Sequence, residues 1–251
     1  MSDLNRDLLT AVNAGRMEAV RALLQNPSVD PNKHQSLHWA VTFGKVEMAK
    51  ILVEHGADVN KHGMAGKETP LIIALTHSQP ELVAYLLKHG ADPNIPSKAS
   101  KKYPLSYAYT VPMIELLLKH GADVNIATAS ESFLISALPR NFEAFKKLLE
   151  AGANVNEVDK DGYTPLIMAV EQGNNDVVKV LLQYGADIEV RGPSGRSVFE
   201  IAPKPSTKKI LESHRPAPIP ITKLSSSDRV VEPTKVVDAS APPVEAPHQH
   251  K

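Results

Sequence analysis

A short pattern that ends in asparagine occurs four times along this chain of 251 residues. It reads His-Gly-Ala-Asp-Val-Asn at 55–60 and at 120–125, and close variants stand at 89–94 and 151–156. The glycines of these segments and Gly185 follow one another at spacings of 34, 31, 31 and 33 residues. Such a period is typical of a linear array of similar units, in which each unit packs only against its neighbours.

The segment 159–189 shows what one unit contains. It opens with the turn signal Asp161-Gly162. Thr164-Pro165 then favours a helix start, because threonine can cap free N–H groups and proline suits the first helical position. Two apolar runs at helical spacing follow, namely Leu166, Ala169 and Val170, then Val177, Val178, Leu181 and Leu182. Gly173 separates them, and Gly185 stands where a left-handed residue ends a helix. We therefore predict two helices per unit, whose apolar faces need neighbouring units to cover them.

A period near 33 with a Thr-Pro-Leu helix start, as at 69–71 and 164–166, resembles the ankyrin repeat family. The resemblance extends from about residue 3 to residue 214. It implies an all-α solenoid of helix-turn-helix repeats joined by short β-turn fingers, so we expect residues 1–214 to form one ankyrin repeat domain. The expected repeats, with the first and last as caps, are 3–32, 33–60, 61–94, 95–125, 126–156, 157–189 and 190–214.

The remaining segment, 215–251, differs in composition from the repeats. It holds seven prolines, no glycine and no aromatic residue. A segment of this kind cannot bury enough apolar surface to offset the entropy lost on ordering. We expect a disordered tail with polyproline-II character.

Three units depart from the repeat. Only Lys33 and His34 separate Asn32 from the next helix start, so that finger should be nearly absent. The fourth unit is short around 110–112, which predicts a short inner helix, and Pro139 should end the inner helix of the fifth unit early. Trp39, the sole tryptophan, occupies a position that the family resemblance implies is buried between helices.

Composition excludes several classes of function. The 28 basic residues balance the 28 acidic ones, which gives no general attraction to nucleic acid or to an anionic membrane. The chain has no cysteine, and no nucleophile, phosphate-loop or zinc motif stands in it. Its N-terminus does not read as a secretory signal, and no apolar run reaches membrane length. We expect a cytoplasmic, monomeric, non-catalytic protein without cofactor or metal that binds a protein partner rather than nucleic acid or membrane.

The family resemblance also implies where a partner would bind. Ankyrin proteins commonly hold partners on a concave face made of finger tips and the C-terminal ends of the inner helices. The matching candidates here are Thr42, Phe43, His77, Lys101, Lys102, Arg140, Lys160, Asp161, Tyr163, Glu171, Gln172 and Arg196. Aromatic and arginine side chains dominate binding energy at many interfaces, so Phe43, Arg140, Tyr163 and Arg196 lead. Tyr109 could join them, whereas Tyr107 is expected to pack inside. The inner helix of the fourth unit should end near Thr110-Val111.

Two other hypotheses remain open. Cysteine-free ankyrin proteins with a polar C-terminal tail resemble effectors that intracellular bacteria deliver into host cells, where the tail would be an export signal or a linear motif. Alternatively, the repeats are the substrate of an asparaginyl hydroxylase, since Asn60 and Asn125 stand in a context that resembles the site such enzymes modify in ankyrin proteins.

Overall fold

The structure is a computed structural model, and it describes residues 3–63, 68–126, 134–135 and 141–215. The predicted tail, Pro139 and Arg140 lie outside these ranges. The described residues are almost wholly helices and turns, and the β-structure among them is an isolated bridge between Arg191 and Ser197. No helix in these ranges combines the length and the apolar composition that crossing a membrane requires.

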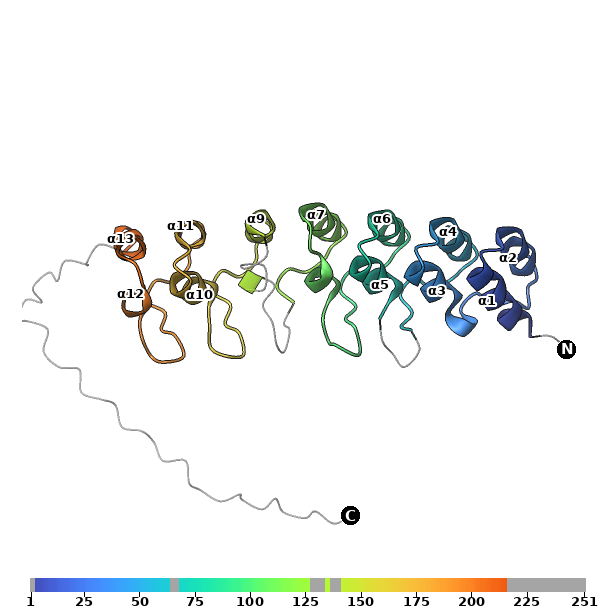
Figure 1. Cartoon of the computed structure of the whole chain (residues 1–251), viewed down its shortest axis with the longest axis horizontal. Helices are drawn as coiled ribbons and strands as arrows, with labels where there is room; N and C mark the ends of the chain where they lie inside the picture. Colours follow the sequence, from blue (N-terminus) through green and yellow to red (C-terminus); the bar gives the residue numbers. More distant parts are fainter. Residues whose placement is uncertain (1–2, 64–67, 127–133, 136–140, 216–251) are drawn as a thin grey trace, which may run out of the picture. The chain divides into compact units, whose positions relative to one another are not determined.

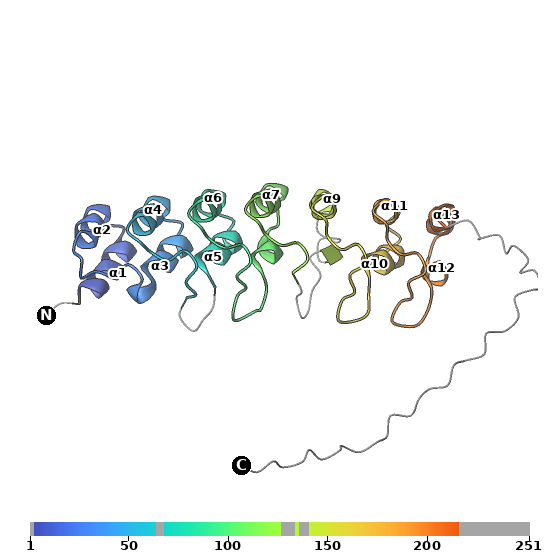
Figure 2. The same ribbon diagram turned by 180° about the vertical axis from the view of Figure 1, so that it is seen from behind.

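The helices form two layers (Figure 1), and the view from behind shows the same arrangement (Figure 2). The inner layer contains α1 (Leu4–Ala14), α3 (Ser36–Thr42), α5 (Pro70–Thr76), the 3-10 helix η3 (Pro104–Tyr107), α10 (Pro165–Glu171) and α12 (Val198–Ile201). The outer layer contains α2 (Met17–Leu24), α4 (Val46–Glu54), α6 (Pro80–Lys88), α7 (Val111–Lys119), α9 (Phe142–Glu150), α11 (Asn175–Gln183) and α13 (Pro205–Ser213). Neighbours contact one another within each layer, as α1, α3 and α5 do.

The hydrophobic core lies between the two layers. Leu71 of α5 and Leu86 of α6 are fully buried, as are Leu8 near the first end and Leu211 near the last. Burying one leucine contributes about 1.5–3 kcal/mol. Because one cluster joins all of these side chains, each helix pair is stabilised mainly by the pairs beside it.

The predicted helix signals are confirmed. Thr69 and Thr164 are N-caps whose hydroxyl oxygens accept from the backbone N–H groups of Ile72 and Ile167. The outer helices α4, α6, α7, α9 and α11 are followed by glycines in the left-handed region, with φ between 82° and 87° at Gly56, Gly90, Gly121, Gly152 and Gly185. No atom lies within 4 Å of a Cβ built on Gly90, so its conformation, not crowding, favours glycine there.

An asparagine at the end of each pattern ties one pair to the next. The side chain of Asn60 donates to the Gly90 carbonyl at 2.9 Å and accepts from the Asp92 N–H at 2.8 Å. Asn32, Asn94, Asn125 and Asn156 make the same two contacts with their own following units. We call these five residues the asparagine ladder. It stabilises the stacking of each unit on the next.

The missing finger of the second unit and the short inner helix of the fourth unit are both confirmed. A 3-10 helix, η1 (Lys33–Gln35), takes the place of the first finger, and His34 and Gln35 adopt positive φ to make the turn. The inner helix of the fourth unit is reduced to η3, four residues of 3-10 helix. The prediction that Thr110 and Val111 end this inner helix is wrong, because Thr110 caps α7 and Val111 is its first residue.

Candidate protein-binding surface

Two aromatic side chains are exposed at the C-terminal end of α3. Trp39 is 39% exposed and Phe43 58% exposed, and their rings stack at 5.4 Å with 8° between the planes. We call Trp39 and Phe43 the aromatic pair. The expectation that Trp39 is buried between helices is wrong. Leu37, Ala40 and Val41 point into the core, and residue 39 is turned out of it by the helical period.

Thr42 lies in a pocket beside this pair. The pocket has a volume of about 370 Å³ and is lined by Gln35, His38, Trp39, Thr42, Gly63, Glu68 and Ile73. Its lining comes from α3, α5, Gln35 at the end of the 3-10 helix η1, and the described part of the loop between α4 and α5. His38 is buried, and its Nε2 donates to the Lys61 carbonyl oxygen at 2.9 Å, which fixes that loop against α3. Burial lowers the pKa of His38, although this hydrogen bond opposes the shift.

A second pocket lies on the other side of Trp39, toward α1. It has a volume of about 520 Å³ and is lined by Arg6, Leu9, Asn32, Lys33, His34, Gln35, Trp39 and Lys61. We call it the basic pocket. Trp39 and Gln35 line both pockets, so the two pockets are neighbours.

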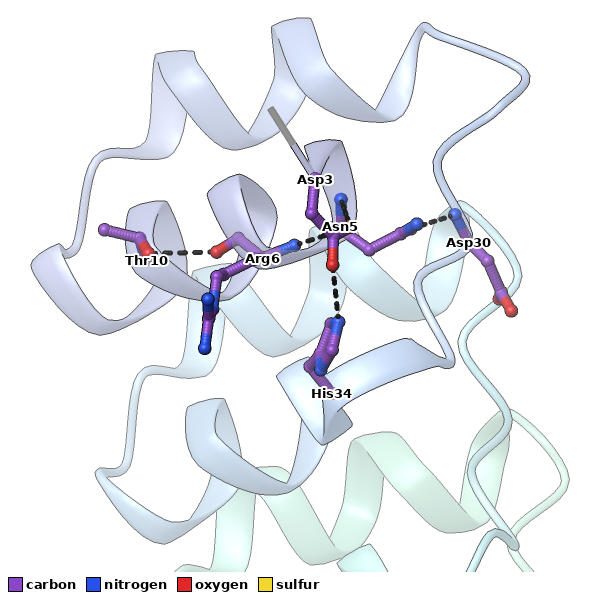
Figure 3. A network of polar contacts seen from close by, with 6 residues as sticks. All are labelled: Asp3, Asn5, Arg6, Thr10, Asp30 and His34. Atoms are coloured by element: carbon purple, nitrogen blue, oxygen red, sulfur yellow. Dashed lines mark hydrogen bonds and ion pairs between the residues drawn. The ribbon is translucent and has the colours of Figure 1, made fainter. Parts of the chain in front are cut away.

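Polar contacts join the start of α1 to Asp30 and to His34, which lines the basic pocket (Figure 3). Asn5 is buried, and its side-chain oxygen accepts from the Asp30 N–H at 2.7 Å. Asp3 caps α1 and also lies 3.3 Å from the His34 imidazole. The Arg6 side chain extends away from this network in the same view.

A lysine supports the aromatic pair from the outer layer. Lys45 donates to the carbonyl oxygens of Val12 and Asn13 at 2.9 Å and 2.7 Å, at the C-terminal end of α1. Its ammonium also lies 6.0 Å from the centre of the Phe43 ring. Its positive charge is favourable at the C-terminal end of a helix, where the helix dipole is negative, and also beside the face of an aromatic ring.

Of the other candidates at inner-helix ends, His77, Glu171 and Gln172 are exposed. The His77 ring bonds to the Ile73 carbonyl of its own helix at 2.9 Å. Glu171 is the last residue of α10, and Gln172 is its C-cap. His77 is the C-cap of α5, which packs against α3, whereas Glu171 and Gln172 stand at the end of α10.

The finger candidates occupy three separate turns. Lys101 is exposed with a φ of 60°, and Lys102 follows it in the fourth finger. Lys160 and Asp161 are exposed at the predicted turn, where Asp159 accepts from the N–H groups of Asp161 and Tyr163. This local bonding confirms the predicted turn at Asp161-Gly162.

Two of the predicted anchors are less available than the sequence suggested. Tyr163 is half-buried and packs against the core. The Arg196 guanidinium donates to the Glu200 carbonyl oxygen within its own unit. Arg140 lies outside the described residues. Of the two tyrosines in the fourth unit, Tyr109 is 53% exposed, and the half-buried Tyr107 pairs its hydroxyl with Ser100 at 2.7 Å.

Asn60 and Asn125 both belong to the asparagine ladder. Each side-chain amide uses its nitrogen and its oxygen in bonds to the following unit. The described ranges hold no group of three or more His, Cys, Asp or Glu side chains that could share a metal ion. His55 instead bonds to the Ile51 carbonyl near the end of its helix, at 2.8 Å.

Sequence reasoning missed the basic pocket. Arg6, Lys33 and Lys61 come from three different units, and nothing in their local sequence connects them. One signal was available: the missing finger before Gln35 removes a loop beside the only tryptophan. Two basic residues, Lys33 and His34, stand in its place.

A two-layer stack of helix pairs with exposed aromatic and charged side chains defines a solenoid repeat protein. The family model described as ankyrin repeats (3 copies) matches this chain at residues 6–63, 61–128 and 105–192. The chain belongs to the ankyrin repeat family. Proteins built from these repeats generally serve as protein-interaction modules.

Several known proteins resemble this chain. Human "Ankyrin repeat and SOCS box protein 6" is 27% identical over 203 residues, which cover 76% of this chain and 34% of that protein. The Caenorhabditis elegans "Ankyrin repeat and LEM domain-containing protein 1 homolog" is 38% identical over 80 residues, or 32% of this chain and 11% of the relative. This chain therefore spans only a minor part of these relatives.

Solved structures match over most of the chain. The ankyrin repeat domain of human ASB11 superimposes with a TM-score of 0.61 at 30% identity, covering 84% of this chain and 98% of that domain. The ankyrin repeat domain of Bcl-3 superimposes with a TM-score of 0.71 at 26% identity, covering 82% of this chain and 97% of that domain. Both support the same two-layer fold.

Proposed function

We propose that this chain is a non-catalytic interaction module that holds a protein partner on the concave face of its solenoid. The contact surface would comprise the C-terminal ends of the inner helices and the finger tips. The aromatic pair is the observation that carries this proposal. Two stacked, exposed rings on a short rigid helix are unusual for a surface that meets only water.

The surface around the pair is already built before a partner arrives. Trp39 and Phe43 stand on α3, and α3 is held on one side by α1 and on the other by α5. His38 and Lys45 anchor the flanking loop and the helix end. Docking on such a surface costs little ordering entropy, so most of the contact energy remains available for affinity.

The test is an affinity capture of partners from the source cell with the full-length chain, read by quantitative mass spectrometry. The variant Phe43→Ala with Arg140→Ala should lose the captured partner, and its thermal melt should stay close to that of the wild type. A matched control is Tyr184→Ala, because Tyr184 is 45% exposed at the C-cap of the outer helix α11. If both variants capture the partner equally, the assignment to the concave face is wrong.

We further propose that the module works as a cytoplasmic monomer, with seven repeats up to residue 214. Light scattering behind a sizing column gives the mass directly, and a value near twice the 27.2 kDa of one chain would refute the monomer. Limited proteolysis tests the domain boundary, because cleavage should begin beyond residue 214 and leave the repeats intact.

The two other hypotheses have their own tests. Deleting 215–251 should abolish delivery into a host cell, but not folding, if the chain is an exported effector. Intact mass of protein produced in a eukaryotic host should show added oxygen at Asn60 or Asn125 if an asparaginyl hydroxylase modifies it. Since both amides already bond to the next unit, such an enzyme would have to detach this link first.

A further inference from the structure

We infer that the basic pocket binds an acidic segment of the protein partner, with an apolar side chain of that segment on Trp39. The inference rests on the proposed function, since it names the chemistry of the partner and one subsite for it. Three observations carry it: the charges that line the pocket, their lack of internal partners, and the exposed indole.

The pocket gathers basic groups from three units. Arg6 comes from α1, Lys33 and His34 from η1, and Lys61 from the loop after α4. No acidic side chain is among its lining residues. Asp3 lies beside the pocket, where its carboxylate pairs with the His34 imidazole and accepts from the backbone N–H of Arg6, not from its guanidinium. The pocket therefore carries a net positive charge although the chain as a whole is neutral.

Most of this charge is not compensated within the molecule. In the ranges that the structure describes, the Arg6 guanidinium and the Lys33 ammonium make no hydrogen bond or ion pair. Lys61 donates one hydrogen bond, to the Asn32 carbonyl at 2.8 Å, which positions its ammonium and leaves two donors. Four lysines of the outer helices, by contrast, have carboxylate partners within the described residues: Lys50, Lys146, Lys147 and Lys179. A carboxylate that enters the pocket would supply the missing counter-charge.

Trp39 and Leu9 supply an apolar side to the same pocket. A volume of about 520 Å³ has room for a few side chains, not for a folded domain. The occupant with the right chemistry is an extended or single-turn peptide that combines two or more acidic residues with one apolar residue. Tryptophan and arginine are the residue types that most often dominate binding energy, and here they line one pocket.

A peptide fits these observations better than nucleic acid. Binding to nucleic acid needs a basic stripe that follows successive phosphates. Arg6, Lys33, His34 and Lys61 all line the same pocket and form no stripe. Acidic residues stand along the second and third units, namely Glu47, Glu68 and Glu81. Nucleic acid is therefore kept as an outcome of the test.

The test starts from a displayed library of random twelve-residue peptides, selected on the immobilised full-length chain. Recovered peptides are synthesised and titrated by calorimetry and by the fluorescence of Trp39, which is the sole tryptophan. The charge variant is Arg6→Glu with Lys33→Glu. It should fold normally, because both side chains are exposed and a glutamate near the start of α1 suits the helix dipole. The matched control is Lys208→Glu with Lys209→Glu, an equal charge change on the exposed side of α13.

We expect peptides rich in Asp and Glu around one apolar residue. Their affinity should fall at least about tenfold in the charge variant and in Trp39→Ala, and by less than about twofold in the control. Their affinity should also weaken by about threefold or more between 50 and 300 mM salt, because the paired charges are partly exposed and salt screens them.

Other outcomes overturn the inference, and they separate it from the proposed function. Neutral or basic peptides whose affinity depends on Phe43 but not on Arg6 and Lys33 would overturn the acidic subsite and leave the proposed function standing. A labelled twelve-nucleotide thymidine strand that binds as tightly as the selected peptides would also overturn it. If no peptide is recovered and no partner is captured, both the inference and the proposed function fail.

Discussion

Replacing Asn60 by alanine should loosen the contact between the second and third units. The substitution removes two hydrogen bonds at once, from the side-chain nitrogen to the Gly90 carbonyl and from the Asp92 N–H to the side-chain oxygen. Each hydrogen bond contributes about 0.5–1.5 kcal/mol to the free energy of unfolding. Water can reach this half-buried site and rebond the freed groups, so we expect a loss of about 1–2 kcal/mol in total.

The assay is urea unfolding followed by circular dichroism, together with hydrogen exchange of individual amides. The Asp92 amide gives a local readout, because it loses its acceptor in Asn60→Ala and should exchange faster. Asn13→Ala is the matched control, since the Asn13 side chain makes no hydrogen bond within the described residues. The reasoning is refuted if the two variants unfold within about 0.5 kcal/mol of each other and the Asp92 amide exchanges at the wild-type rate.

Three further predictions test the local physics. Gly90→Ala should lower the free energy of unfolding by about 1–2 kcal/mol in urea titrations, because a φ of 87° strains any residue with a Cβ, and a result near zero would contradict this. Thr164→Ala should lower the free energy of unfolding by about 1 kcal/mol and Thr164→Ser by much less, since the Thr164 hydroxyl accepts from the Ile167 N–H at 3.3 Å. If thermal melts show the two variants in another order of stability, the hydroxyl is not the cap. The folded pKa of His38 lies below its ordinary 6.5 because of burial, so the unfolded state takes up a proton first as pH falls. Stability should therefore be full above pH 6.5 and decline below it, and His38→Gln should remove that decline in unfolding titrations from pH 5 to 8.

The helix starts and stops could be predicted because they depend on neighbouring residues. A threonine caps the N–H three residues later, and a glycine after the last turn takes a positive φ, whatever lies across the molecule. The same local logic predicted the two layers of helices, since each unit carries two apolar faces of the same kind. It also predicted a short inner helix in the fourth unit, although not its end at Tyr107, since the helix was expected to end near Thr110-Val111.

The candidate site was predicted less well. Thr42, Phe43 and His77 stand where the family resemblance implied, at the C-terminal ends of inner helices. Trp39 was expected to be buried, and residues of its size and apolar character usually are. Its exposure follows from the helical period of α3, which turns Leu37, Ala40 and Val41 to the core and residue 39 away from it.

What the sequence by itself determined is the repeating part: the period, the caps, the glycine ends and the asparagines, because each depends on interactions within one unit or between identical places in adjacent units. What only the tertiary structure decided is the pocket beside Trp39. Arg6, Lys33 and Lys61 are far apart in sequence, and stacking three units brings them around one indole. The physical reason is that helix signals act over a few residues, whereas charge acts through space between whichever side chains the packing places together.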